Sequence, residues 1–518
     1  MANLFEHKDR RVVPNWRSFG NTIVLGELNS FQKERIIPLE EVSIESYIID
    51  WKFNKTVIHA SDLLSAALVN NFKTNKDVIE AAKYILQNSK VASVSQISLA
   101  NKILNNSEII DLSAPFNSVT LQGLHSFTNT QPIWQKIRET KQNIKLYPFN
   151  PVFYVELSRY YSILGLKEKS VNAMKIALHL GSNNRFILRS ATRLFAHFGE
   201  LDYTHDILRK NPLTNFDPWL ISAEISIATI RKRTSKFMKK GIELINSRNI
   251  SPFNFTELAS SLGTVELLNG STKKSRDLFN KSMIAPNDNS LAQIEWASQK
   301  DTHLEVNPES FPVKLNYEAL ALDNFQNEKY DLAIDNAAKW FIDMPFSKRP
   351  ILFGSNLAST ILKDQEKSIA FLNAGLISHP NDPQLLNNYA YALALDNKAK
   401  EALEQLNKIK SEIPIEGSTK ICLTATRGLA FFRSGFPELG RNLYLEAIEE
   451  TKSIHNATLN WIAILNYARE EILIGSEYID NVMDAVGKIP KDAKDIEIKI
   501  LREDVIQAFE NYKSKPKE

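Results

Sequence analysis

The sequence has very little cysteine and glycine, with one cysteine, Cys422, and 17 glycines among 518 residues. One cysteine cannot form an internal disulfide or a thiolate metal cage, which fits a reducing compartment, and we expect Cys422 to be a small buried hydrophobe. With few glycines and a hydrophobic fraction of 43%, the composition indicates a helix-rich protein with an ample core. These values argue against disorder over most of the chain.

The sequence also lacks a dominant charge and a long apolar run. Its 63 basic and 60 acidic residues leave a formal net charge of +3, so any attraction to nucleic acid or anionic lipid must be local. No run of about 18 apolar residues occurs, and the first residues do not resemble a signal peptide. We therefore expect a cytoplasmic protein that has no membrane partner.

What the sequence does contain is a repeat of about 34 residues, a period typical of helical solenoids. Residues of the same kind recur at this spacing in two distant parts of the chain: Gly165 and Gly199, Ser368 and Ala402, Pro380 and Pro414. In one unit, Tyr154, Leu157 and Tyr161 share one face of a helix. Gly165 then supplies the turn to a second helix. Each unit is therefore expected to be a pair of antiparallel amphipathic helices.

This pattern resembles the tetratricopeptide repeat (TPR) family, in the style of bacterial members. The copies that carry the resemblance include Leu262-Gly263, Gly270, Ser275, Phe279, Ser282 and Pro286; Tyr317, Leu320-Ala321, Ala333, Ala337 and Pro345; and Leu386, Tyr389-Ala390, Ala402, Leu406 and Pro414. The resemblance implies an all-α fold, a right-handed superhelical solenoid of antiparallel helix pairs. It also implies a function in binding rather than in catalysis.

The repeat sets the expected organisation of the chain. Residues 149–450 form the TPR-like array, in which 217–247 is a drifted unit because charge dominates its second half. Before the array we expect an extended arm over 1–50, packed on the protein itself or on a partner, and a helical cap over 51–148 that covers the apolar end of the array. Residues 451–518 are expected to form C-terminal capping helices and a polar tail.

In the TPR family, the first helices of successive units line a groove that holds peptide segments. Carried over by position, the groove residues of this chain are Arg159, Arg189, Arg193, Leu322, Phe325, Phe353, Asn387 and Tyr391. Arginine and aromatic side chains are common interface anchors, and asparagine can pair with a peptide backbone. The alternative is ordinary solvated surface. The lysine and asparagine clamp of chaperone-binding relatives is not reproduced, which disfavours a chaperone adaptor.

A second candidate site is a basic ridge that falls on second helices. Its residues are Arg231, Lys232, Arg233, Lys236, Lys239, Lys240, Lys273 and Lys274. Stacked together, they could bind phosphates in a salt-sensitive manner that does not depend on base sequence. The alternative is a solvated outer face, because second helices of the family usually face outward.

Motifs for catalysis are weak. The segment Gly270–Ser275 lacks the glycine spacing of a phosphate loop, and no His-Glu-x-x-His pair occurs. Glu497 and Lys499, with an aspartate before them, have the spacing of a metal-dependent nuclease. That chemistry needs a pair of strands, whereas Ile498 and Leu501 continue a helical pattern. We therefore predict no enzyme activity, no cofactor and no metal site.

The leading hypothesis is a scaffold or sensor subunit of a multiprotein assembly, which binds a peptide segment or a partner domain in its groove. The alternative is a nucleic-acid-associated factor that uses the basic ridge, as the partner of an effector or nuclease in a bacterial defence or regulatory module. A concealed hydrolase around Glu497 is a third hypothesis. The sequence does not identify the partner.

Overall fold

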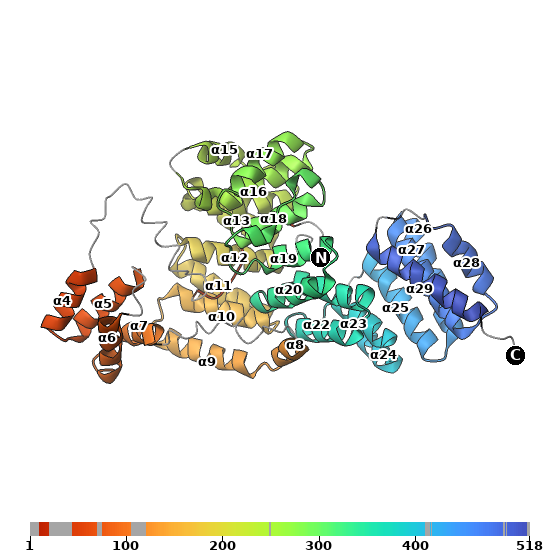
Figure 1. Ribbon diagram of the computed structural model, residues 1–518, viewed down its shortest axis with the longest axis horizontal. Helices are drawn as coiled ribbons and strands as arrows, with labels where there is room; N and C mark the ends of the chain where they lie inside the picture. Colours follow the sequence, from red (N-terminus) through yellow and green to blue (C-terminus); the bar gives the residue numbers. More distant parts are fainter. Residues whose placement is uncertain are drawn as a thin grey trace. The chain divides into compact units, whose positions relative to one another are not determined.

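The computed structural model describes residues 10–19, 44–69, 75–104, 121–247, 250–409, 415, 417–490, 493 and 495–514. All regular secondary structure in these ranges is helical, and the chain divides into two compact units (Figure 1). The smaller unit falls within Arg17–Ser118 and Arg248–Ser251, and the larger unit within Met1–Trp16, Val119–Ser247 and Pro252–Glu518. Parts of the expected arm (1–9 and 20–43), Pro414 of the repeat pattern and residues 515–518 of the expected tail lie outside the described residues.

The smaller unit contains four described helices: α4 (Ile44–Phe53), α5 (Val57–Val69), α6 (Lys76–Gln87) and α7 (Val94–Leu104). They share an apolar core that includes Trp51, Leu63 and Ile85. Asn75 begins α6, because its side-chain oxygen accepts a hydrogen bond from the Asp77 backbone N–H at 2.8 Å. The region expected as a cap, 51–148, is therefore shared between this unit and the first helices of the larger one. Capping of the array stays a prediction.

The larger unit is built from helices paired in chain order (Figure 1). After α8 (Leu121–Phe127) and α9 (Gln131–Leu146), the pairs are α10 (Pro151–Ile163) with α11 (Lys167–Leu180), α12 (Arg185–His197) with α13 (Leu201–Lys210), α14 (Pro218–Ile230) with α15 (Met238–Asn246), α16 (Pro252–Leu268) with α17 (Thr272–Ser282), α19 (Tyr317–Gln326) with α20 (Tyr330–Asp343), α21 (Lys348–Asn356) with α22 (Gln365–Ser378), α23 (Pro383–Leu395) with α24 (Ala399–Asn407), α25 (Ser418–Arg433) with α26 (Pro437–Ser453), and α27 (Ala457–Ile474) with α28 (Ile479–Gly487). The C-terminal helix α29 (Ile496–Lys513) packs on α27. This all-α solenoid of TPR-like helix pairs confirms the predicted fold class.

Short helical segments mark where the repeat departs from its period. Helix α18 (Asp288–Ser298) is followed by two 3₁₀ turns, η2 (Thr302–Leu304) and η3 (Pro308–Ser310), in place of a second α-helix. The pairs α16–α17 and α19–α20 therefore begin more than one repeat period apart. A further 3₁₀ turn, η1 (Pro212–Asn215), precedes α14, and α21 continues into a π-helical segment, η4 (Leu357–Ile361). None of the helices in the described ranges has the length and apolar character needed to span a lipid bilayer.

An Asn-Pro or Asp-Pro pair starts several first helices. The side chains of Asn150, Asp217 and Asp382 each accept a hydrogen bond from the backbone N–H two residues later, at 3.1, 2.9 and 3.0 Å. A proline follows each of them at the first helical position, where its missing N–H costs no hydrogen bond. These local signals fix where α10, α14 and α23 begin.

Small residues set the close approach of paired helices. At Gly354 in α21, a Cβ atom would lie only 2.5 Å from the ring of Phe371 in α22. The backbone of α21 and this ring are therefore in direct contact. Moving them apart would open a void in a buried cluster. Gly165 has a φ of +68° in the turn between α10 and α11, and it lies against the carbonyl of Ser378 at the end of α22.

Replacement of Gly354 by alanine should lower stability by about 1–3 kcal/mol, because the added methyl group overlaps the Phe371 ring. Thermal unfolding followed by circular dichroism should show a lower midpoint. The matched control is Gly487→Ala in α28, where nothing lies within 4 Å of the added Cβ. Equal melting temperatures for the two variants would contradict this account of the packing.

Candidate functional site

The segment Arg10–Trp16, here called the arm segment, is packed into the larger unit. Arg10 is 3% exposed, and Val12, Val13 and Trp16 are buried. The Trp16 ring lies 5.2 Å from that of Phe346, centroid to centroid, in a cluster that also contains side chains of α10, α11, α12 and α20. The arm segment is thus part of the core between the start of the array and the α20–α21 connection.

The Arg10 guanidinium is bound by side chains from two helices, α18 and α19. Its Nε donates to Glu318 Oε1 at 2.7 Å, and its two terminal nitrogens donate to Asn289 Oδ1 at 2.7 Å and Gln293 Oε1 at 2.8 Å. Arg349 from α21 also pairs with Glu318, at 2.7 Å. Burial by itself raises the pKa of Glu318, but the positive charges of Arg10 and Arg349 outweigh it and hold that pKa below its ordinary value.

Side chains of the array also bind the backbone of the arm segment. Asn289 Nδ2 donates to the Val13 carbonyl at 3.1 Å, and Gln293 Nε2 donates to the Arg10 carbonyl at 3.3 Å. At the other end, Arg159 Nε approaches the Trp16 carbonyl at 3.4 Å. These contacts satisfy backbone groups that an extended chain cannot satisfy by itself. We call the surface that makes them the arm channel; it is formed by α10, α12, α18 and α19.

Replacement of Arg10 by alanine should destabilise the protein by about 3 kcal/mol, because it removes one partner of a buried ion pair and leaves polar groups of α18 unpaired. The arm segment should then become more accessible to trypsin, which limited proteolysis can follow beside the melting temperature. Arg233→Ala, at an exposed arginine after α14, is the matched control. If both variants melt and digest like the parent protein, the ion pair does not hold the arm segment.

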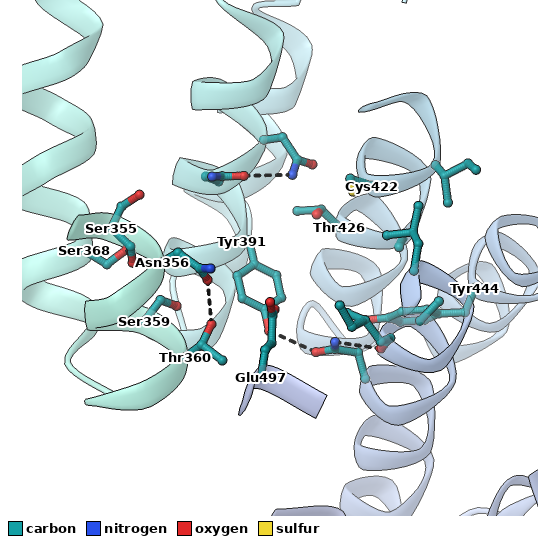
Figure 2. Close-up of a pocket in the computed structure, with 18 residues that line it drawn as sticks. Ser355, Asn356, Ser359, Thr360, Ser368, Tyr391, Cys422, Thr426, Tyr444 and Glu497 are labelled. Carbon is teal, nitrogen blue, oxygen red and sulfur yellow. Dashed lines mark hydrogen bonds between the residues drawn. The ribbon is translucent and has the colours of Figure 1, made fainter. Parts of the chain in front are cut away.

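A cavity of about 160 Å³, lined by both polar and apolar side chains, lies farther along the larger unit. It is lined by residues of α21 and η4, α22, α23, α25, α26, α27 and α29, and we call it the amide pocket because four asparagines contribute to it: Asn356, Asn387, Asn388 and Asn466. Figure 2 shows Tyr391 and Glu497 next to each other at its centre. A cavity of roughly this volume admits a benzene-sized group.

Hydrogen bonds orient most of the polar groups in the amide pocket (Figure 2). Tyr391 donates to Asn466 Oδ1 at 3.0 Å, and Thr360 donates to Asn356 Oδ1 at 3.0 Å. Asn387 Nδ2 donates to the neighbouring Asn388 Oδ1 at 3.3 Å. The remaining oxygen of Asn387 has no hydrogen-bond partner, although the residue is only 6% exposed. A buried amide oxygen without a partner costs free energy, and this oxygen is left as an acceptor at the wall of the cavity.

Glu497 enters the pocket from the first turn of α29. Burial, and then the negative charge of Asp495, raise the pKa of Glu497 to about 7, while a hydrogen bond from Asn356 works in the opposite direction. Burial also raises the pKa of Tyr391, to which the charge of Glu497 contributes. The pocket therefore holds a carboxyl group that loses its proton near neutral pH.

The pKa of Glu497 makes stability depend on pH in a defined direction. Its folded-state value of about 7 lies above the ordinary 4.5, so its contribution to stability is complete below 4.5 and is lost as the pH rises through 7. Glu497→Gln should flatten the fall in melting temperature across this interval. Some slope should remain, since burial raises the pKa of Glu295 to about 8. Glu503→Gln, at an exposed position of α29, should leave the pH profile unchanged, and an unchanged profile for Glu497→Gln as well would contradict the assignment.

The groove residues expected from the sequence fall into three places. Arg159, Arg189 and Arg193 bind groups of the chain itself: Arg189 forms two hydrogen bonds with Glu257, at 2.8 and 3.0 Å, and Arg193 is buried beside Phe346. Leu322 is half-buried, and the rings of Phe325 and Phe353 pack together at 5.6 Å. Asn387 and Tyr391 both line the amide pocket. A role of the eight residues in partner binding stays a prediction.

The sequence pattern does not predict the contacts of the other residues of these sites. Arg10 and Trp16 belong to a segment without periodicity, and the spacing around Glu497 pointed only to a metal-dependent reaction. Its place in α29 agrees with the helical pattern that argued against that reaction. Cys422 is half-buried and lines the amide pocket, rather than lying wholly in the core as we expected. Among the described residues, no group of three or more His, Cys, Asp or Glu side chains is placed to hold a metal ion.

The basic ridge is mostly exposed. Arg231, Lys232, Arg233 and Lys236 lie in the turn between α14 and α15, and the other four residues lie on α15 and α17. Arg231 is an exception to the exposure, because it pairs with Asp202. Lys281 Nζ donates to Asn246 Oδ1 at 3.3 Å, so α15 and α17 lie beside each other. Phosphate binding by this ridge stays a prediction.

Comparisons with known proteins add little to this geometry. No family model matches the chain, and no curated protein matches it either. Among solved structures, the chain is similar to the crystal structure of the yeast Tom70, with 15% identity and a TM-score of 0.28, over 77% of this chain and 96% of that one. A similarity of this size supports no inference about function. The class of protein therefore rests on its own helix pairs, which define a TPR-like α-solenoid.

Proposed function

We propose that this protein is a non-catalytic interaction scaffold or sensor subunit of a multiprotein assembly, and that its TPR-like array binds extended segments of protein chains. The single observation that carries the proposal is the arm channel, in which the array holds an extended segment through both its side chains and its backbone. The single cysteine of the chain supports a cytoplasmic setting.

The arm channel has the two elements of peptide recognition. Amide side chains on α18 bind backbone carbonyls, which gives affinity for any extended segment in the correct register. Glu318 and the apolar cluster around Phe346 then select an arginine and an aromatic residue six positions apart. Buried arginine and tryptophan side chains are frequent hot spots of protein interfaces.

The amide pocket supports the same function at a second place in the array. Most of its lining residues come from first helices of successive pairs, namely α21, α23, α25 and α27. Its asparagines offer donors and acceptors at fixed positions, because hydrogen bonds to neighbouring groups already orient several of them. A preformed site of this kind loses little conformational entropy on binding.

The proposal predicts that the channel binds the arm sequence when it is supplied as a separate molecule. In the full chain, the double variant Arg10→Ala/Trp16→Ala should release the arm segment and leave the channel accessible. A fluorescent peptide with the sequence Arg10–Arg17 should then bind to this variant saturably, as measured by fluorescence anisotropy. The parent protein should bind it much more weakly, because its own arm segment occupies the channel.

Two controls make the result specific. A peptide with alanine at the positions of Arg10 and Trp16 should bind at least about tenfold more weakly, which corresponds to about 1.4 kcal/mol. Adding Asn289→Ala to the double variant should weaken binding of the original peptide, because the backbone contact to the Val13 carbonyl is lost. If the folded double variant binds neither peptide, the arm segment is a structural strap and the channel is not a recognition site.

A further inference from the structure

The amide pocket has a charge pattern that points to a particular ligand. Glu497 is the only charged side chain among the described residues that line it, and the other polar groups are amides and hydroxyls. Glu497 is half-buried and its pKa is raised chiefly by the loss of water around it, so a negative charge on it is only partly compensated in the unliganded protein. A positively charged group bound in the pocket would supply the missing compensation.

The positively charged side chains near the pocket do not compensate a negative charge on Glu497. Burial raises the pKa of Tyr391, and the charge of Arg469 opposes this rise. Arg469 is already paired with Glu470 at 2.8 Å, and Glu470 also binds Arg433 at 2.6 Å. Neither arginine is among the lining residues. On the surface of α29, Lys363 pairs with Asp504. The carboxyl group of Glu497 therefore faces the cavity without a cationic partner among the described residues.

Two kinds of acceptor line the pocket. One is the carboxyl group of Glu497, and the other is the unpaired Asn387 oxygen, which is buried and lines the same cavity. Hydroxyl oxygens of Ser359 and Thr360 lie on the wall opposite Cys422, as Figure 2 shows. These acceptors suit a ligand that carries several N–H donors and no acceptor of its own.

The remaining walls are apolar and match an aliphatic chain. Ile421, Leu459 and Ile462 contribute from α25 and α27, and the Tyr391 ring lies at the centre of the pocket. Methylene groups can pack against these side chains, and an aromatic ring face attracts a cation. A slender aliphatic stem with a compact cationic end therefore fits better than a flat or anionic group.

We propose that the amide pocket binds the side chain of a lysine presented by an extended segment of a partner protein. The ammonium group donates to Glu497 and to the free oxygen of Asn387, and the stem packs between Tyr391 and the apolar residues of α25 and α27. Lysine is favoured over arginine because an ammonium has three donors to satisfy, whereas a guanidinium has five in a fixed plane. This inference rests on the proposed scaffold function and names the chemistry recognised at one of its sites.

The test uses the full chain and three acetylated, amidated pentapeptides, Gly-Ala-Lys-Ala-Gly and its counterparts with norleucine or glutamate in place of lysine. Isothermal titration calorimetry should show that the lysine peptide binds at least about tenfold more tightly than the norleucine peptide. Glu497→Gln should abolish this preference, and Glu503→Gln should preserve it. Circular dichroism checks that each variant is folded.

A second readout locates the bound peptide. Cys422 is the single cysteine of the chain and lines the same pocket, so its alkylation by iodoacetamide should slow when the lysine peptide is bound. Asn387→Ala should weaken the binding of the lysine peptide and restore the alkylation rate. Protection of Cys422 by the lysine peptide, but not by the glutamate peptide, is the expected result.

Each contrary outcome has its own meaning. Equal binding of the lysine and norleucine peptides would overturn the cation inference, while loss of both in Asn387→Ala would leave the pocket as a peptide site. Tighter binding of the glutamate peptide, or no binding of any peptide, would also overturn it. The arm peptide tests the scaffold function separately, because the arm channel shares no residue with the amide pocket.

Discussion

A guanidinium group can be buried only where acceptors surround it, and this constraint organises the first half of the larger unit. Arg10 meets it with Glu318, Asn289 and Gln293, which α18 and α19 present together. Arg349 of α21 balances the same carboxylate. The arm segment therefore connects helices that are far apart in sequence, and its Trp16 completes the apolar cluster beside them. Without this segment, the channel would expose both charged and apolar groups to water.

The arm channel and the amide pocket, the two proposed binding sites, use the same kinds of side chain. In the channel, side-chain amides hold a backbone, and an ion pair with an aromatic contact sets the register. In the pocket, side-chain amides and the carboxyl group of Glu497 line a cavity. Both sites are built on helices fixed by close pair packing, as at Gly354 and Phe371. Rigid helices keep polar groups at constant spacing, which is the property a scaffold needs.

Much of the fold could be predicted from the sequence, because its signals are local. Apolar residues at helical spacing, and Asn-Pro or Asp-Pro pairs such as Asp382-Pro383, mark helices wherever the chain is placed. Less of the candidate site could be predicted from the sequence. Asn387 and Tyr391 were selected by their position in a repeat, and the structure adds Glu497 to them, about a hundred residues later in the chain. No periodic pattern connects residues separated by that distance.

By itself, then, the sequence determined that this chain is a helical solenoid, since the pairing of neighbouring helices depends on contacts within one repeat period. Only the tertiary structure decided that Arg10–Trp16 fills a channel in the array, and that Glu497 shares a cavity with Asn387. The physical reason is the range of the interactions. Helix formation and pair packing depend on residues nearby in the chain, whereas the burial and pairing of a charge depend on whichever distant groups the completed fold brings beside it.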